Sequence, residues 1–166
     1  MIFRDPETAL RWAYETSARP VVKSSGVYGM RGAERGGASE LKPYDYIAQA
    51  GLIKLLCERA LSPLHLAYVE VRYGRNPARL GPLRCYVASR LGTGIHSVRC
   101  IDLVIRGYCG EQVAMRDMLK AGRCRYRTVI EVRNRCHDDL DAIHQKTMEL
   151  LWREMDEAKM MSTEHI

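Results

Sequence analysis

RYRTVIEVRNRCHDDLDAIHQKTMELLWREMDEA, residues 125–158, is the stretch of sequence that decides the fold class of this chain. Its first part alternates as a strand does, from Cys124 to Val132, and contains strand-forming residues. Its second part carries a stripe with the spacing of a helix, and no glycine or proline separates the two parts. This continuity favours one long helix from Arg125 onward. The stripe consists of Leu140, Ile143, Thr147, Leu150, Leu151 and Met155.

Upstream of this stretch, residues 111–121 predict a shorter helix, and Gly122 predicts the turn that follows it. Two helices joined by such a turn have the layout of a helix-turn-helix, whose second helix enters the major groove of DNA. Arginine suits that groove because it pairs with the acceptor edge of guanine and also reaches phosphates. In the second helix, Tyr126, Val129 and Ile130 can face inward. The candidate DNA-binding residues are Arg116, Lys120, Arg123, Arg125, Tyr126, Arg127, Thr128, Arg133 and Arg135.

Five further helical patterns precede this motif. Each begins at a proline or near a residue whose side chain can cap a helix, such as Asp5 or Ser97. They predict an all-α fold of six or seven helices in one domain, residues 1–166, in which residues 97–158 form the helix-turn-helix and the long C-terminal helix. The residues after Ala158 are expected to fray. The five patterns span residues 6–17, 43–61, 62–71, 82–91 and 97–105.

Residues 18–42 differ in character from the helices around them. Glycine and basic residues dominate the segment, which predicts a long, flexible, basic loop. A loop of this length in a compact domain usually has a function, although a tolerated insertion is an equally good explanation. If the loop is functional, its cations can follow a nucleic-acid backbone. The candidate contact residues are Arg19, Lys23, Arg31 and Arg35.

The basic charge is concentrated in one part of the chain. Residues 72–135 contain fourteen Arg or Lys against four Asp or Glu, and thirteen of those cations are arginine. Residues 138–166 contain eight acidic residues against three basic ones. An arginine-rich segment with interspersed apolar residues can fold and present its cations to a polyanion, and double-stranded DNA is the first candidate. The alternative is a solvated surface that only keeps the protein soluble.

No run of about 18 apolar residues predicts a membrane span, and the N-terminus lacks the layout of a signal peptide, so we expect a cytoplasmic protein without a membrane partner. In that compartment the six cysteines favour buried thiols over disulfides. No pair has the Cys-x-x-Cys spacing. A zinc site could be drawn from Cys109, Cys124, Cys136 and His137, but those spacings match no common ligand pattern, and we predict no cofactor.

An enzyme must also be considered. Four histidines and an acidic cluster supply candidate acids and bases. A pair of aspartates on one helical face, near Gln145, could hold a divalent metal as in nucleases, although acidic residues on a solvated helix need no such role. No phosphate-binding GxxxxGK[ST] motif and no GxSxG motif occurs, and a non-enzymatic role is favoured. The candidates are His65, His96, His137, His144, Asp138, Asp139 and Asp141.

The run Val104-Ile105-Arg106-Gly107-Tyr108-Cys109-Gly110-Glu111 follows a basic loop and a helical body and precedes the helix-turn-helix. This arrangement resembles the Q-like transcription antitermination proteins of lambdoid phages and their bacterial relatives, in particular the phage 21 Q and AlpA-like group. The helix-turn-helix is also similar to that of sigma factor region 4. It departs from that pattern at Met118, where a small residue is usual, and at Gly122, which comes one residue early.

The resemblance implies a function without bond chemistry. Proteins of this family bind a DNA element near a promoter, load onto RNA polymerase that still holds its sigma factor, and promote read-through of terminators. In the phage 21 type, the protein narrows the RNA exit channel around the nascent RNA. Carried over, residues 116–135 would bind DNA, and the body or the basic loop would line the RNA path. The alternatives are a dimeric helix-turn-helix promoter regulator joined by its C-terminal helix and, with less support, a metal-dependent nuclease.

Overall fold

The computed structural model describes residues 3–18, 43–91 and 97–161, and these are almost entirely helical, as predicted. Residues 19–42, with Arg19, Lys23, Arg31 and Arg35, lie outside the described residues, as does His96. Seven α-helices and one short 3-10 helix occur in the described ranges. They are α1 (Pro6–Ala18), α2 (Pro43–Ala60), α3 (Pro63–Arg72), η1 (Pro77–Arg79), α4 (Leu80–Leu91), α5 (Val98–Tyr108), α6 (Met115–Gly122) and α7 (Tyr126–Glu157).

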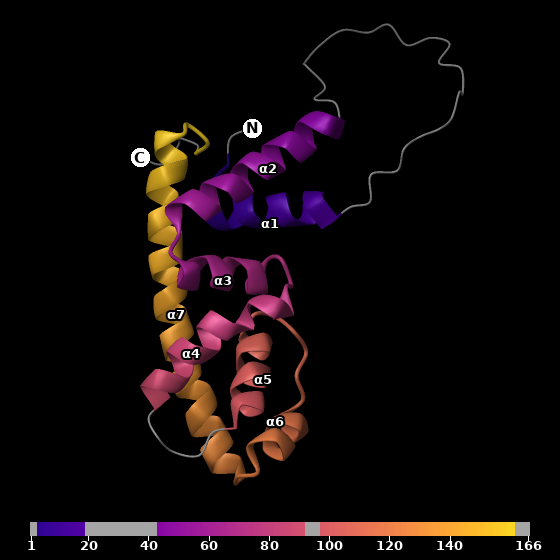
Figure 1. Ribbon diagram of the computed structural model, residues 1–166, viewed down its shortest axis with the longest axis vertical. Coiled ribbons are helices and arrows are strands. Elements are labelled where there is room, and N and C mark those ends of the chain that lie inside the picture. Colours follow the sequence, from indigo (N-terminus) through magenta and orange to yellow (C-terminus); the bar gives the residue numbers. More distant parts are fainter. Residues whose placement is uncertain (1–2, 19–42, 92–96, 162–166) are drawn as a thin grey trace, which may run out of the picture.

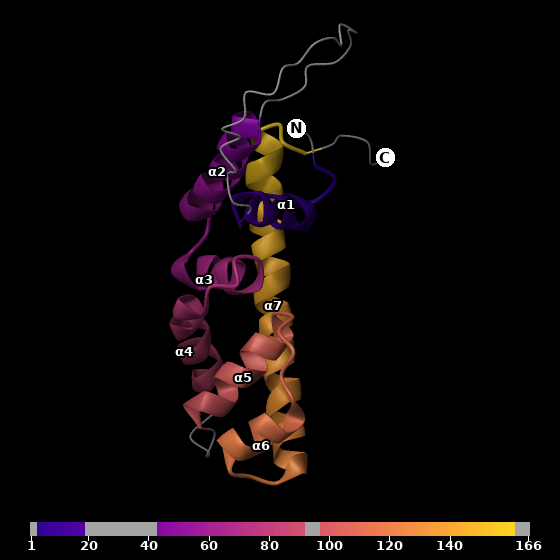
Figure 2. The ribbon, with the colours of Figure 1, turned by 90° about the vertical axis from the view of Figure 1, so that its right-hand side faces the viewer.

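Helix α7 is the long axis of the molecule. It contains 32 residues, and a helix of that length extends about 48 Å. Every other α-helix in the described part packs against it. Helices α1 and α2 lie beside its C-terminal end, α3 and α4 beside its middle, and α5 and α6 beside its N-terminal end (Figures 1 and 2). The helix-turn-helix is therefore at one end of an elongated molecule, away from α1 and α2.

The core follows the stripe predicted on the long helix. Buried positions recur every three or four residues along α7, which is the spacing that keeps one face of a helix toward its neighbours. The stripe extends further toward the N-terminus than its clearest part in the sequence, because Val129, Val132 and Cys136 are also buried. Leu150 is only partly buried and packs at the edge. The alternation that also suggested a strand thus has no structural counterpart, and the continuous helix is confirmed.

The predicted helix starts are confirmed at Asp5 and Ser97. The carboxylate of Asp5 accepts a hydrogen bond of 2.7 Å from the backbone N–H of Thr8. The hydroxyl of Ser97 accepts one of 3.1 Å from the backbone N–H of Cys100. Each bond satisfies an N–H group that has no partner within its helix.

The C-terminal boundary was predicted less well. Helix α7 ends at Glu157, but the chain does not fray there: Met161 is buried, and the backbone N–H of Phe3 donates a 2.8 Å hydrogen bond to the carbonyl of Met160. Residues 159–161 therefore hold the start of the chain against the end of α7, which corrects the prediction of fraying for these three residues; residues 162–166 lie outside the described residues.

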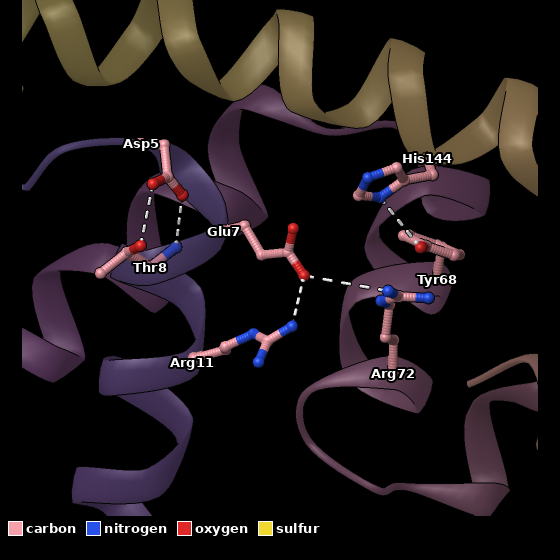
Figure 3. Close-up of polar contacts among 7 residues, drawn as sticks. All are labelled: Asp5, Glu7, Thr8, Arg11, Tyr68, Arg72 and His144. Carbon is pink, nitrogen blue, oxygen red and sulfur yellow. Dashed lines mark hydrogen bonds and ion pairs between the residues drawn. The ribbon is translucent and has the colours of Figure 1, made fainter. Parts of the chain in front are cut away.

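A polar cluster joins α1, α3 and α7 (Figure 3). Glu7 accepts a 2.8 Å hydrogen bond from Arg11 and lies 3.8 Å from Arg72. The hydroxyl of Tyr68 is 3.0 Å from Nδ1 of His144. The Arg72 guanidinium also lies over the rings of three tyrosines, including Tyr68. The first arginine of the basic segment is thus engaged inside the fold.

The histidines of the described residues predict an acid-sensitive fold. Burial lowers the pKa values of His65, His137 and His144 below 6.5, so their contribution to stability is present above about pH 6.5 and is lost as the pH falls. We expect the free energy of unfolding to fall as the pH drops from about 7.5 to about 5.5. Urea unfolding at both pH values measures this, and equal midpoints would contradict it. His144→Gln should reduce the pH dependence.

Candidate nucleic-acid interface

The turn between α6 and α7 is formed by an arginine and not by the glycine. Arg123 has φ 49° and ψ 35°, the left-handed conformation that ends a helix, and its backbone N–H donates a 2.9 Å hydrogen bond to the carbonyl of Leu119. Gly122 is the last residue of α6. This corrects the assignment of the turn to Gly122 and accounts for that glycine coming one residue early.

Gly122 has a packing role instead. A Cβ atom at this position would lie 3.0 Å from Sγ of Cys124 and 3.3 Å from Sγ of Cys100. The missing side chain therefore lets the end of α6 approach α5 closely. The hydroxyl of Ser97 also donates a hydrogen bond to the carbonyl of Ala121. Together these contacts fix the turn against the start of α5.

The first helix of the motif is shorter than predicted. Residues 111–114 are not helical, and α6 begins at Met115. Glu111 instead forms an ion pair with Arg106 of α5. Met118 is buried against the core, so the larger residue at this position fills space between α6 and its neighbours.

The structure brings most of the predicted DNA-binding residues to one end of the molecule. Tyr126 is 60% exposed, so it does not face inward with Val129. Thr128 and Arg133 are only partly exposed, and Nε of Arg133 is buried without a hydrogen-bond partner among the described residues, which reduces the availability of Arg133 to a ligand. The fully exposed cations of the predicted set are Arg116, Lys120, Arg123, Arg125, Arg127 and Arg135.

The N-terminus of α7 adds partial positive charge to these side chains. Its N-cap residue is Arg125, which has no side-chain acceptor, and no acidic residue occupies the first turn. The first backbone N–H groups of a helix lack partners within the helix and carry the positive end of its dipole. At this helix they lie among Arg123, Arg125 and Arg127, an arrangement suited to phosphate. We call Arg123, Arg125, Tyr126 and Arg127 the tip.

Several other arginines of the basic segment hold helices together. Nε of Arg84 on α4 lies 2.7 Å from the carboxylate of Asp102 on α5. Nε of Arg90 on α4 lies 2.5 Å from that of Asp139 on α7. Lys120, Arg123, Arg125 and Arg135, by contrast, have no ion-pair partner within the ranges that the structure describes. The excess positive charge is therefore left at the α6–α7 end.

Sequence reasoning missed one exposed cation. Arg99 lies in the first turn of α5, the helix whose start packs against Gly122 through Cys100. Arg99 was not among the predicted DNA-binding residues because the predicted helix-turn-helix contained only the two helices that became α6 and α7. The hydrogen bond between Ser97 and Ala121 places the start of α5 beside the end of α6, so Arg99 belongs to the same end of the molecule.

Glu131 restrains one residue of the tip. Its carboxylate accepts a 3.1 Å hydrogen bond from Nε of Arg127, one helical turn away. Glu131→Gln should release Arg127 and remove a charge that repels phosphate, which raises affinity for double-stranded DNA roughly 2- to 5-fold at low salt. Fluorescence anisotropy with a labelled duplex measures this. The matched control is Glu149→Gln, which removes a similar pair with Lys146 far along α7 and should leave affinity unchanged.

The residues of the nuclease hypothesis make separate structural contacts. Asp139 pairs with Arg90, Asp141 accepts a 2.5 Å hydrogen bond from the hydroxyl of Tyr108, and Asp138 is exposed. His65 lies 2.8 Å from the hydroxyl of Thr147. Within residues 3–18, 43–91 and 97–161, no three His, Cys, Asp or Glu side chains gather closely enough to hold a metal ion.

The cysteines of the zinc hypothesis differ in their surroundings and do not form one group. Burial raises the pKa of Cys136 to about 12 and that of Cys109 to about 11, which favours the neutral thiol. Cys124 instead lies near Cys100, beside Gly122. A zinc site needs deprotonated thiolates converging on one point, and these side chains do not provide one.

A cleft of about 1060 Å³ opens among α1, α2, α3 and the end of α5. Its lining includes Tyr14, Tyr73 and Tyr108 together with Arg72 and Arg75, and such aromatic and guanidinium groups can hold single-stranded nucleic acid. Its charge is nearly balanced, because cations and carboxylates both line it. The tip is therefore the stronger candidate for binding a polyanion. The other charged lining residues are Arg11, Lys54, Glu15, Glu58 and Glu70.

No family model, curated protein or solved structure matches this chain. No helix of the described segments has both the length and the apolar content needed to cross a membrane.

Proposed function

We propose that this protein is a DNA-binding transcription antitermination factor of the cytoplasm. The observation that carries the DNA-binding part is the tip: the uncapped N-terminus of α7 among Arg123, Arg125 and Arg127, at the extreme end of an elongated molecule (Figure 1). The antitermination part rests on the resemblance of residues 104–111 and of the order of elements to the Q-like proteins. The two parts have separate support and separate tests.

In this proposal the tip binds a double-stranded element near a promoter. The protein then loads onto RNA polymerase that still holds its sigma factor and modifies the RNA exit channel, so that terminator hairpins fail to form. The tip can enter the major groove end-on because the rest of α7 leads away from it (Figure 2). The tyrosines and arginines of the cleft offer the nascent RNA a surface on the body.

Single-round transcription tests the proposal. The template carries the protein's native upstream region, a promoter and a downstream terminator, and purified RNA polymerase transcribes it with and without the protein. We expect terminator read-through to rise only when the upstream element is present. A change in initiation without a change in read-through would identify a promoter regulator instead.

The basic loop has its own test in the same assay. Reversing the charges of Arg31 and Arg35 should reduce read-through if the loop contacts RNA or polymerase, and DNA binding should persist because the tip is unchanged. Intact read-through by this variant would remove the loop from the mechanism.

A dimeric promoter regulator joined by its C-terminal helix is the second candidate, and the buried stripe of α7 is not the part of that helix that could join two copies. The apolar stripe of α7 is used within the chain, since Leu140, Ile143, Leu151 and Met155 are all buried against the other helices. A dimer joined by this stripe would have to open the core.

A further inference from the structure

Helix α2 presents an apolar face that no other part of the described chain covers. Apolar residues of α2 are not confined to the side that packs in the core, although the helix also carries charged residues such as Asp45 and Arg59. One side packs against α1 and α7 through Ala50, Ile53 and Cys57. On the other side, Leu52 is 53% exposed and Leu55 is similarly exposed.

This face is a patch and not a scatter of single residues. Three of the six large apolar side chains that are exposed in the described part of the chain lie on α2: Leu52 and Leu55 on this face, and Ile47 about 140° round the helix from Leu52. Positions 48, 52, 55 and 59 recur at the spacing of one helical face, and all four are exposed. Contiguous exposed apolar surface on a soluble domain commonly marks an interaction site.

Small residues allow another helix to approach closely. Ala48 and Gly51 lie on this face, and a Cβ atom built at Gly51 would meet no atom within 4 Å. A glycine in a helix interior lowers helix stability by roughly 0.5–1 kcal/mol relative to alanine, and no packing contact with the described residues accounts for it here. Close approach by a partner helix is a physical reason for its presence.

The charges of this face are arranged to complement a copy of themselves. Asp45 lies toward one end of the face and Arg59 at the other, with Leu52 midway between them. If two α2 helices pack antiparallel about a twofold axis at Leu52, each Asp45 faces Arg59 of the other copy. A carboxylate accepts hydrogen bonds from more than one donor, so this pairing is compatible with other contacts of Asp45.

We propose that the exposed face of α2 is a self-association surface, on which two copies of this chain pack as an antiparallel helix pair about Leu52. The surface lies at the end of α7 opposite the tip (Figure 1). The two tips of the dimer therefore stay free to bind nucleic acid. The inference does not depend on the proposed function.

Sedimentation velocity of the full chain at ~1 to ~100 µM tests the surface, because an interface made by one helix pair is small and we expect micromolar affinity for it. We expect the wild type to shift from monomer to dimer. Leu52→Lys should remain monomeric and, since Leu52 is exposed, should keep its helical circular dichroism. Val98→Lys is the matched control, because Val98 is 54% exposed on α5, and it should dimerise as the wild type does.

Charge exchange tests the register. Arg59→Asp should weaken dimerisation at least 10-fold by placing two carboxylates opposite each other, and the double variant Asp45→Arg with Arg59→Asp should restore it. In a Cys85→Ser background, Leu52→Cys should form a covalent dimer on mild oxidation, whereas Val98→Cys should not.

Two results on the dimer itself would overturn the inference. One is a wild type that remains monomeric over the whole concentration range. The other is a dimer that Leu52→Lys and the charge exchange leave unchanged. Loss of polymerase binding in Leu52→Lys, with an unaltered mass distribution, would assign the face to polymerase instead and would equally overturn it.

Discussion

Charge reversal at the tip, Arg125→Glu with Arg127→Glu, is expected to lower affinity for double-stranded DNA by about 100-fold at low salt. Both side chains are exposed, and they flank the uncapped N-terminus of α7, where the helix dipole adds to their attraction for phosphate. The fold should be unaffected, because neither side chain packs in the core. Fluorescence anisotropy with the upstream element measures the change.

Single alanine variants separate base reading from phosphate binding. Arg125→Ala or Arg127→Ala should cost about 1–3 kcal/mol of binding free energy if that arginine reads a base, and the loss should be specific to one sequence. If the arginine contacts only phosphate, the loss is smaller, equal for all sequences and accompanied by a shallower salt dependence. Arg153→Glu is the control for the charge reversal at Arg125 and Arg127, because Arg153 is an exposed arginine far along the same helix. Equal losses in the control and in the tip variant would contradict a local interface.

Gly74→Ala is expected to lower the free energy of unfolding by about 2–3 kcal/mol. A Cβ atom at Gly74 would lie 2.6 Å from the backbone carbonyl oxygen of Glu70 and 2.9 Å from Cε1 of Tyr14. The first contact is with the backbone of α3, which cannot move without disturbing the end of that helix. The second is with the ring of Tyr14 on α1, which would have to turn aside.

Gly81→Ala is the matched control for this substitution. Gly81 lies in the first turn of α4, and a Cβ atom there would meet no atom within 4 Å. Because Pro82 follows, its ring disfavours the helical conformation of a residue with a Cβ atom at position 81, and this offsets the helix preference of alanine; we expect a stability within about 1 kcal/mol of the wild type. Urea unfolding of both variants measures the difference. A Gly74→Ala variant as stable as Gly81→Ala would show that the close approach of α1 and α3 is not required.

Most of the secondary structure could be predicted because its signals are local. The proline or capping residue before a helix and the spacing of apolar residues within it act over one or two turns, and Asp5, Ser97 and the stripe around Leu140 behaved as these rules require. The start of α6 was missed because Glu111 turns away from the helix to pair with Arg106. This ion pair forms in the folded chain, and it outweighs the weak preference of residues 111–114 for a helix.

The candidate interface could be predicted only in part. The concentration of arginine is a property of the sequence, and it directed attention to residues 116–135. The sequence does not show which arginines remain available to a ligand. Arg84 and Arg90 are neutralised by Asp102 and Asp139, which are distant in the chain. The inward orientation predicted for Tyr126 was wrong, because burial of Val129 and Val132 fixes the rotation of α7 about its axis and leaves Tyr126 exposed.

The sequence by itself determined that this protein is all-α, that its last long segment is one helix, and that its positive charge is concentrated before the acidic C-terminal region. These properties depend on neighbouring residues and on composition. Only the tertiary structure decided that Arg123 forms the turn, that the tip stands at the far end of α7, that Met161 returns to Phe3, and that one face of α2 is exposed. Each of these depends on distances between segments, which packing of the whole chain sets and no local pattern records.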